Sequence, residues 1–274
     1  MATVGENALI GSRTNVDDHG LERIRMRVPL RAVAVVLCAS VALAGRSAAA
    51  QDDGEWKVSL LPYAWLAGIH GQIGLAGSTA DVNLGLSDIF DQIDISVNAA
   101  FEARRGRWLG RLDATYIALS AREPIGGGVS GDLVFELERS TLQPEIGYRV
   151  LVTRWGGIDA TVGGRYWAPH MHVTADAAGG STEIASGNRS WWDGIGGLRL
   201  RAEPVPKWHL FAASDVGAGG SKLTWQASGG VGYDVGSCCS VVAVYRHLDV
   251  EYNHAGFVND TYVSGPGFGI DIRF

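Results

Sequence analysis

Hydrophobic residues recur at every second position along much of this chain, and polar residues fill the positions between them. Within residues 94–104, for example, Val97 and Phe101 fall on one face, whereas Asn98 and Glu102 fall on the other. A period of two places successive side chains on opposite faces of a β-strand. The pattern therefore predicts strands that are apolar on one face and polar on the other.

Ten segments fit this pattern, and residues that favour turns separate them. Short turns and longer, Gly- and Ser-rich connections alternate between the segments, with the short connection at 217–221 as an exception. This alternation is typical of an up-and-down antiparallel β-barrel that spans a membrane. The predicted strands are 56–66, 94–104, 108–116, 142–152, 158–168, 192–203, 208–216, 222–235, 241–252 and 261–274. The predicted short turns are 104–107, 153–157, 204–207, 217–221 and 236–240, and the predicted longer connections are 120–131, 169–190 and 253–260.

The strand count depends on the region between the first two predicted strands. Residues 72–75 and 80–84 predict a small hairpin, and residues 87–91 predict a short helix with Ser87 as its N-cap. If this region is an extracellular loop, ten strands span the membrane. If the hairpin also spans, the count is twelve; eight is the smaller alternative. We expect an all-β transmembrane barrel of ten strands.

The alternation continues to the last residue, through Phe268, Ile270, Ile272 and Phe274. A final strand of this kind can pair with the first strand and so remove the open edge of the sheet, which a membrane does not tolerate. The pattern resembles the C-terminal signature by which bacterial outer-membrane barrels are recognised for assembly. We therefore expect the barrel assembly machinery and outer-membrane lipids as partners, and the oligomeric state stays open.

The N-terminal part of the sequence predicts export. A cluster of arginines at 23–31 precedes an apolar run at 32–44, and small residues at 48–50 offer a cleavage site. This order is typical of a secretory signal peptide, and the run is shorter than the roughly 20 residues of a membrane-spanning helix. We therefore expect residues 1–50 to be an N-terminal extension with a signal peptide, starting at either Met1 or Met26, and residues 51–274 to be the barrel domain.

Composition narrows the class of partner. The chain carries 23 Lys and Arg against 29 Asp and Glu, a net charge of −6, which argues against nucleic-acid binding. It also has 38 Gly and 9 Trp. Glycine suits tight turns and narrow lumens, and Trp suits the two interfaces between lipid and water, so we expect Trp mainly at the strand ends.

The polar faces of the predicted strands carry charges of both signs at matching depth. Such a set has two interpretations, either salt-bridged filling of a narrow barrel or the lining of a selective pore. Ten strands lie nearer the filled eight-strand barrels than the open barrels of about 16 strands, so filling is favoured. In residues 241–252, however, Arg246 shares a face with Val244 and Leu248, which leaves the lipid side of that strand undecided. The predicted lumen set is Glu102, Arg104, Arg111, Asp113, Glu145, Arg149, Asp159, Arg165, Arg199 and Arg201.

Candidate catalytic and metal-binding residues are sparse. His247 and Asp249 share one strand face, but a lipid deacylase would also need a nearby Ser, and a barrel protease would need several acidic residues beside the His. His170, His172 and His254 are too few and too scattered to predict a metal site. We expect no catalytic residue, no cofactor and no metal.

Two cysteines, Cys238 and Cys239, are neighbours in a predicted turn. The sequence leaves two interpretations open, a pair of turn thiols without a role and a disulfide between adjacent residues in an oxidising compartment.

Several stretches of the sequence resemble a group of uncharacterised small outer-membrane β-barrel proteins of Gram-negative bacteria. The resemblance spans nearly all of 51–274 and implies fold and compartment without an activity; at His247 the group favours an aromatic residue such as Tyr. We expect a structural or surface role, with passive passage of small solutes left open; the alternatives are an enzyme acting on outer-membrane lipid or peptide and a loop-mediated adhesin or surface antigen. The stretches are 62–66, 87–90, 101–108, 223–226 and 245–250.

Overall fold

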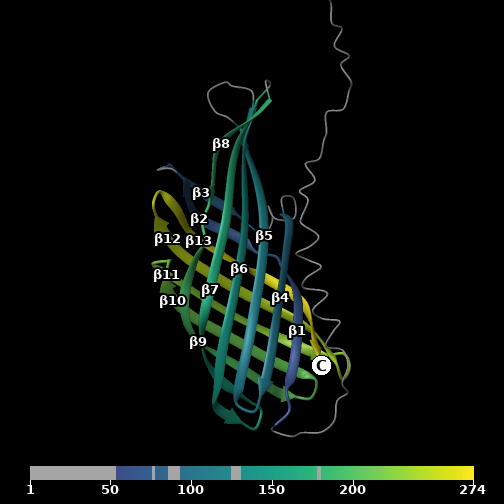
Figure 1. Cartoon of the computed structure of the whole chain (residues 1–274). Helices are drawn as coiled ribbons and strands as arrows, with labels where there is room; N and C mark the ends of the chain where they lie inside the picture. The colour runs from purple at the N-terminus through teal and green to yellow at the C-terminus, as the bar shows by residue number, and fades with distance from the viewer. Residues whose placement is uncertain (1–53, 76–77, 86–92, 125–130, 178–179) are drawn as a thin grey trace, which may run out of the picture. The chain divides into compact units, whose positions relative to one another are not determined.

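The structure is a computed structural model that describes residues 54–75, 78–85, 93–124, 131–177 and 180–274 (Figure 1). The predicted signal peptide and the predicted helix at 87–91 lie outside the described residues. Thirteen strands make up the described part: β1 (Lys57–Trp65), β2 (Gly68–Leu75), β3 (Ser78–Leu84), β4 (Ile93–Arg105), β5 (Trp108–Pro124), β6 (Gly131–Thr153), β7 (Gly156–Ala177), β8 (Gly180–Asn188), β9 (Trp191–Val205), β10 (Trp208–Gly219), β11 (Leu223–Asp234), β12 (Cys239–His254) and β13 (Phe257–Arg273).

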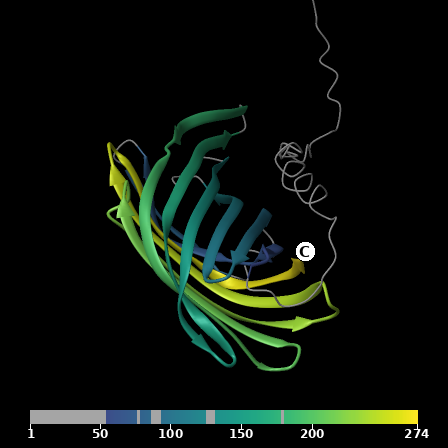
Figure 2. The same cartoon turned by 60° about the horizontal axis from the view of Figure 1, so that its bottom comes forward.

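Ten of these strands form a closed antiparallel barrel. The order around it is β1-β4-β5-β6-β7-β9-β10-β11-β12-β13, and β13 pairs with β1 to close the sheet (Figures 1 and 2). The expected count of ten strands is therefore confirmed. We call the end where β1 begins and β13 ends the base, and the opposite end the rim.

The other three strands lengthen the wall toward the rim. β2 continues β1 along β13 in one unbroken register, from Trp65 opposite Gly267 to Gly68 opposite Ser264. β3 folds back on β2, so the predicted hairpin exists and lies in the barrel wall. β8 continues into β9 in the same way, with both strands paired to β7. The β2–β3 hairpin therefore lengthens the barrel wall and does not add membrane-spanning strands.

The wall is much taller on one side than on the other. β6 and β7 have 23 and 22 residues, whereas β10 and β11 have 12 each. The predicted loop 169–190 is wrong, because β7 runs to Ala177 and β8 pairs back along it. The predicted connection 120–131 is too long for the same reason, since β5 reaches Pro124 and β6 begins at Gly131. Most of β8 is exposed, so no buried face imposes an alternation that a sequence could reveal.

The predicted long connection at 253–260 is also wrong. β12 ends at His254 and β13 begins at Phe257, which leaves Ala255 and Gly256 as the turn. Their φ angles are 49° and 77°. Two successive residues with positive φ fit the type I′ turn, whose twist matches that of a hairpin. The polar residues 259 and 260, which suggested a loop, pair with β12 as part of β13.

The described residues contain no helix with the length and hydropathy that crossing a membrane requires.

Candidate functional site

The outer face of the barrel is apolar. Side chains that would be buried in a soluble protein are largely exposed here; Val162, for example, is 66% exposed and Ile146 61%. A contiguous apolar surface of this kind is not stable in water, whereas lipid solvates it. Other members of this belt are Val150, Leu198, Leu210, Val216, Val241, Tyr245, Phe268 and Ile270.

Two rows of aromatic rings border this apolar belt. Near the base, Trp108 packs edge-on against Tyr148, and Trp208 packs against Tyr233. Toward the rim, Tyr166 packs against Trp192. A second group at the rim continues across β11, β12, β13 and β2 through Trp225, His247, Tyr262 and His70, with ring centroids 4.6–5.3 Å apart.

Aromatic rows on both sides of an apolar belt mark the two interfaces of a membrane. A closed sheet without free edges is the only β-structure that can cross one. The chain is an outer-membrane β-barrel. Such barrels have their longer extensions on the extracellular side, so the tall rim is extracellular and the base is periplasmic.

The structure places the predicted lumen set on the inner face of this outer-membrane barrel. Asp159 on β7 accepts hydrogen bonds from Arg104 of β4 and Arg149 of β6, with closest N–O distances of 2.6 and 2.8 Å. Arg104 therefore reaches past two strands, which only an inward side chain can do. Every member of the set takes part in at least one ion pair: Glu102, Arg104, Arg111, Asp113, Glu145, Arg149, Asp159, Arg165, Arg199 and Arg201.

A hydrogen-bonded network crosses the middle of the interior. Arg246 on β12 donates to Tyr63 of β1 at 2.7 Å and to Asp113 of β5 at 3.1 Å. Arg165 on β7, which is fully buried, donates to Asp215 of β10 at 2.6 Å. Two glutamines connect these halves. We call this group the central network: Tyr63, Asp113, Gln143, Arg165, Asp215, Gln226 and Arg246.

One glycine makes space for this network. An added Cβ on Gly197 would lie 2.7 Å from the Cβ of Asp215, which is too close for any real contact. The absence of a side chain on that inward position of β9 lets the Asp215 carboxylate reach Arg165 and Gln143.

An apolar layer lies on the extracellular side of the central network. Along three strands the inward side chain changes from polar to apolar in a single step of two residues: Tyr63 to Trp65, Arg165 to Trp167, and Arg246 to Leu248. Trp167, Trp191 and Tyr252 stack in sequence, and the Trp65 ring packs 4.9 Å from the Arg246 guanidinium. The described members of this layer include Trp65, Ile69, Trp167, Met171, Trp191, Leu248, Val250, Tyr252, Phe257 and Val263.

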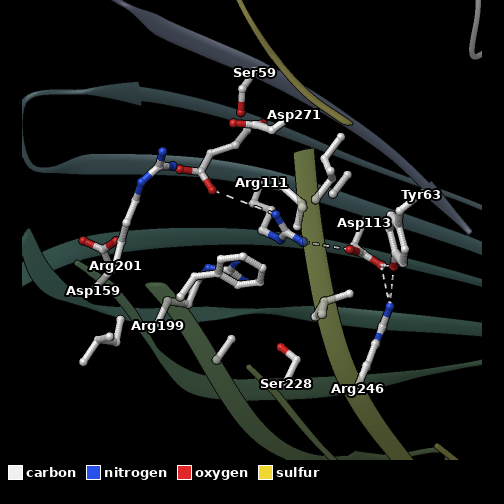
Figure 3. A pocket seen from close by; sticks show the side chains of 18 of the residues that line it. Ser59, Tyr63, Arg111, Asp113, Asp159, Arg199, Arg201, Ser228, Arg246 and Asp271 are labelled. Carbon is white, nitrogen blue, oxygen red and sulfur yellow. Dashed lines mark hydrogen bonds and ion pairs between the residues drawn. The ribbon is translucent and has the colours of Figure 1, made fainter. Parts of the chain in front are cut away.

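On the periplasmic side of the central network the interior contains a cavity of about 130 Å³ (Figure 3). Charged residues from several strands line it, among them Arg104, Arg199 and Arg201. The Arg246 and Asp113 side chains are 7% and 8% exposed, whereas those of Arg199 and Arg201 are 20% and 37% exposed. Because exposure rises toward the base, the cavity opens toward the periplasm.

Sequence reasoning missed several residues of this interior. Asp215 lies on a strand whose faces we did not assign, and the apolar neighbours of Arg246 hid its direction. Val242 and Leu248 also point inward: Val242 lines the cavity, and Leu248 belongs to the apolar layer. The sequence places Trp167 two residues after Arg165, on the same face of β7, and this spacing could have predicted that the Trp167 ring points inward. Both side chains are buried.

The expectation that Trp residues mark the interfaces is only partly correct. Six are at least one-third exposed, but Trp65, Trp167 and Trp191 are buried inside.

The remaining candidate residues lie outside this interior. His247 belongs to the aromatic row at the rim, on the outer face, and makes no hydrogen bond to Asp249 in the described part. His170 and His172 stack on each other on β7. Among the described side chains no group of three or more His, Cys, Asp and Glu could hold a metal ion. Cys238 and Cys239 are free thiols near the base, with their Sγ atoms 2.9 Å apart.

The chain is similar to several solved structures, all at low sequence identity. No model of a known protein family matches the chain, and no curated protein matches it in sequence. Among solved structures it is similar to the outer-membrane protease OmpT from Escherichia coli, with 9% identity over 83% of this chain and 99% of that one and a TM-score of 0.47.

Two other similar structures are also outer-membrane or translocator proteins. The translocator domain of the autotransporter NalP from Neisseria meningitidis is 12% identical over 89% of this chain and 95% of that one, with a TM-score of 0.41. Ail, the attachment invasion locus protein of Yersinia pestis, is 13% identical over 80% and 99%, with a TM-score of 0.33. Likeness at this level assigns no activity and no ligand, so the assignment to the membrane rests on the apolar belt and the aromatic rows.

Proposed function

We propose that this protein is a non-conducting outer-membrane barrel with a structural and surface role. The central network and the apolar layer carry the proposal, because together they occupy the described interior in two successive layers. An ion crossing the barrel would have to break the buried Arg165–Asp215 and Arg246–Asp113 pairs and then pass between Trp65, Trp167 and Trp191. Both steps are costly, since buried pairs and packed aromatic rings do not yield without loss of stability.

The tall rim supports the surface part of the proposal. β6 and β7 exceed β10 and β11 by about ten residues, which corresponds to roughly 33 Å along the strand at 3.3 Å per residue. Strands of this length exceed what the membrane requires, and the excess lies on the extracellular side. A barrel that holds a rigid sheet above the membrane is suited to contact with molecules outside the cell. We propose no catalytic role for His247 and Asp249, because both lie on the outer face among aromatic rings.

Planar-bilayer conductance tests this function. The folded wild-type barrel should give no stable conductance steps, whereas a Trp65→Ala, Arg246→Ala variant, which thins both layers at one place, should begin to conduct. Retention of the heat-modifiable shift on gels would show that the variant still folds. Regular, ohmic steps from the wild-type protein would contradict the proposal and restore the role in small-solute passage.

A further inference from the structure

We propose that the periplasm-facing cavity is a binding site for a small oxyanion, and that Arg199 and Arg201 of β9 bind its phosphate or carboxylate group. The proposal goes beyond the structural role above, because binding in a cavity closed on one side needs no passage through the barrel.

Two of the carboxylates that line the cavity, those of Asp159 and Asp113, accept hydrogen bonds from arginines. Asp159 accepts four hydrogen bonds from Arg104 and Arg149. Asp113 accepts from Arg246 and Arg111. These arginines have therefore used much of their donor capacity inside the protein.

Arg199 and Arg201 are different. Neither donates a hydrogen bond to any described residue. The nearest carboxylate oxygen to Arg199 is that of Glu145 at 3.6 Å, and the nearest to Arg201 is that of Glu203, at 3.8 Å, on a side chain that is 62% exposed. A guanidinium carries five N–H donors in a planar fork that fits the two oxygens of a carboxylate or phosphate. Two such forks at adjacent inward positions of one strand, both lining the cavity, form a receptor for an oxyanion (Figure 3).

The size of the cavity limits the ligand. At about 130 Å³ it is close to a cavity of 150 Å³, which holds one benzene molecule. Inorganic phosphate or a carboxylate of a few carbon atoms fits this volume, whereas a nucleotide or a lipid does not. Asp271 lines the cavity from β13, on the other side of the barrel, and its negative charge should weaken anion binding.

Calorimetric titration of the detergent-folded barrel with inorganic phosphate, at low ionic strength and in a phosphate-free buffer, tests the site. We expect saturable binding of one phosphate, weakened at least tenfold in the Arg199→Gln, Arg201→Gln variant, because each charge-assisted hydrogen bond that is lost has about this effect. Asp271→Asn should tighten binding. Arg154→Gln, in an exposed turn at the base, is the matched control and should leave the affinity unchanged. Absence of saturable binding, or equal affinity in the double variant and the control, would overturn the proposal.

A second measurement does not depend on the affinity for phosphate. Ser228 lines the cavity, so a Ser228→Cys variant in a Cys38→Ser, Cys238→Ser, Cys239→Ser background has its single thiol there. An anionic methanethiosulfonate should modify it faster than a cationic one, and phosphate should slow the reaction. The preference should disappear when Arg199 and Arg201 are replaced by Gln. A faster reaction with the cationic reagent in the otherwise native cavity would contradict the proposal. Conductance does not enter either test, so failure of this site and failure of the non-conducting role are distinguishable.

Discussion

At the scale of single residues, charges fill this barrel and polar interactions hold them in place. Asp215 accepts hydrogen bonds from Arg165, Gln143 and Gln226, and all four side chains are buried. A buried ion pair can contribute little net stability when compared with an apolar replacement, yet removal of one partner leaves the other charge without compensation. Removal of one partner of the Arg165–Asp215 pair should therefore cost more stability than replacement of both partners by apolar residues.

We predict that Asp215→Ala lowers the free energy of unfolding by about 3–5 kcal/mol, because it strands the buried Arg165 guanidinium. Asp215→Leu combined with Arg165→Met should cost less than the single change. Urea titration of the barrel in detergent or lipid measures both. Lys222→Ala, which breaks the exposed pair with Glu251, is the control and should have little effect. A double variant less stable than Asp215→Ala would show that the pair itself stabilises the barrel.

Replacement of Arg139, in contrast to that of Asp215, should stabilise the barrel. It is 3% exposed, and among the described residues it makes neither a hydrogen bond nor an ion pair; its guanidinium lies 5.5 Å from the Trp167 ring. Because an unpaired buried charge is costly, Arg139→Met should raise the free energy of unfolding by about 1–3 kcal/mol in the same titration. A loss of stability instead would mean that a residue beyond the described part neutralises this charge.

At the scale of elements, the sequence is most informative where a strand has lipid on one side and the polar interior on the other. Residues 94–104 and 142–152 meet this condition, and their alternation located β4 and the basal half of β6. β12 does not meet it, because its inner face passes from Arg246 to Leu248, Val250 and Tyr252 within the apolar layer. β8 has no buried face at all. The ladder of backbone hydrogen bonds with β7 holds it, and no side-chain pattern records such a ladder.

A single substitution in the turn between β12 and β13 should stabilise the barrel. Ala255 adopts a φ of 49°, which costs a residue with a Cβ about 1–2 kcal/mol, and Asn tolerates this region better. We predict that Ala255→Asn raises the free energy of unfolding by about 0.5–1 kcal/mol. Gly256→Ala, at a φ of 77°, should lower it. Shifts of the same sign in both variants would argue against a type I′ turn.

The last strand carries the predicted contact with the assembly machinery. Phe268 and Ile270 lie on the outer face of β13, where the surrounding surface is apolar, and the exposed Phe274 directly follows the end of this strand. We predict that Phe274→Ser reduces the amount of folded barrel in cell outer membranes several-fold, because the signal read during assembly is weakened. Refolding of the purified variant into detergent should change little, since the side chain is 40% exposed. Equal loss in both measurements would assign Phe274 to barrel stability instead.

At the scale of the whole molecule, the barrel has two apolar regions with different surroundings. The outer belt faces lipid, and the inner layer is enclosed by the wall and the central network. The sequence predicted the first from alternation but not the second, because an apolar interior breaks the polar-inside rule on which the assignment of faces depends. Trp191 and Trp192 show the division at adjacent positions, since Trp191 is 7% exposed and Trp192 is 52% exposed.

This division gives a final prediction, based on the two adjacent tryptophans. Brominated lipids quench the fluorescence of indole rings that contact acyl chains and leave enclosed rings unquenched. Trp192 faces outward in the aromatic row with Tyr166, whereas Trp191 stacks on Tyr252 and donates from its indole nitrogen to Ser221 at 2.7 Å. Trp192→Phe should therefore reduce the quenchable part of the emission in brominated bilayers, and Trp191→Phe should reduce the unquenchable part. If Trp191→Phe removed quenchable emission instead, the inner layer would be open to lipid, and neither the closed interior nor the non-conducting role could stand.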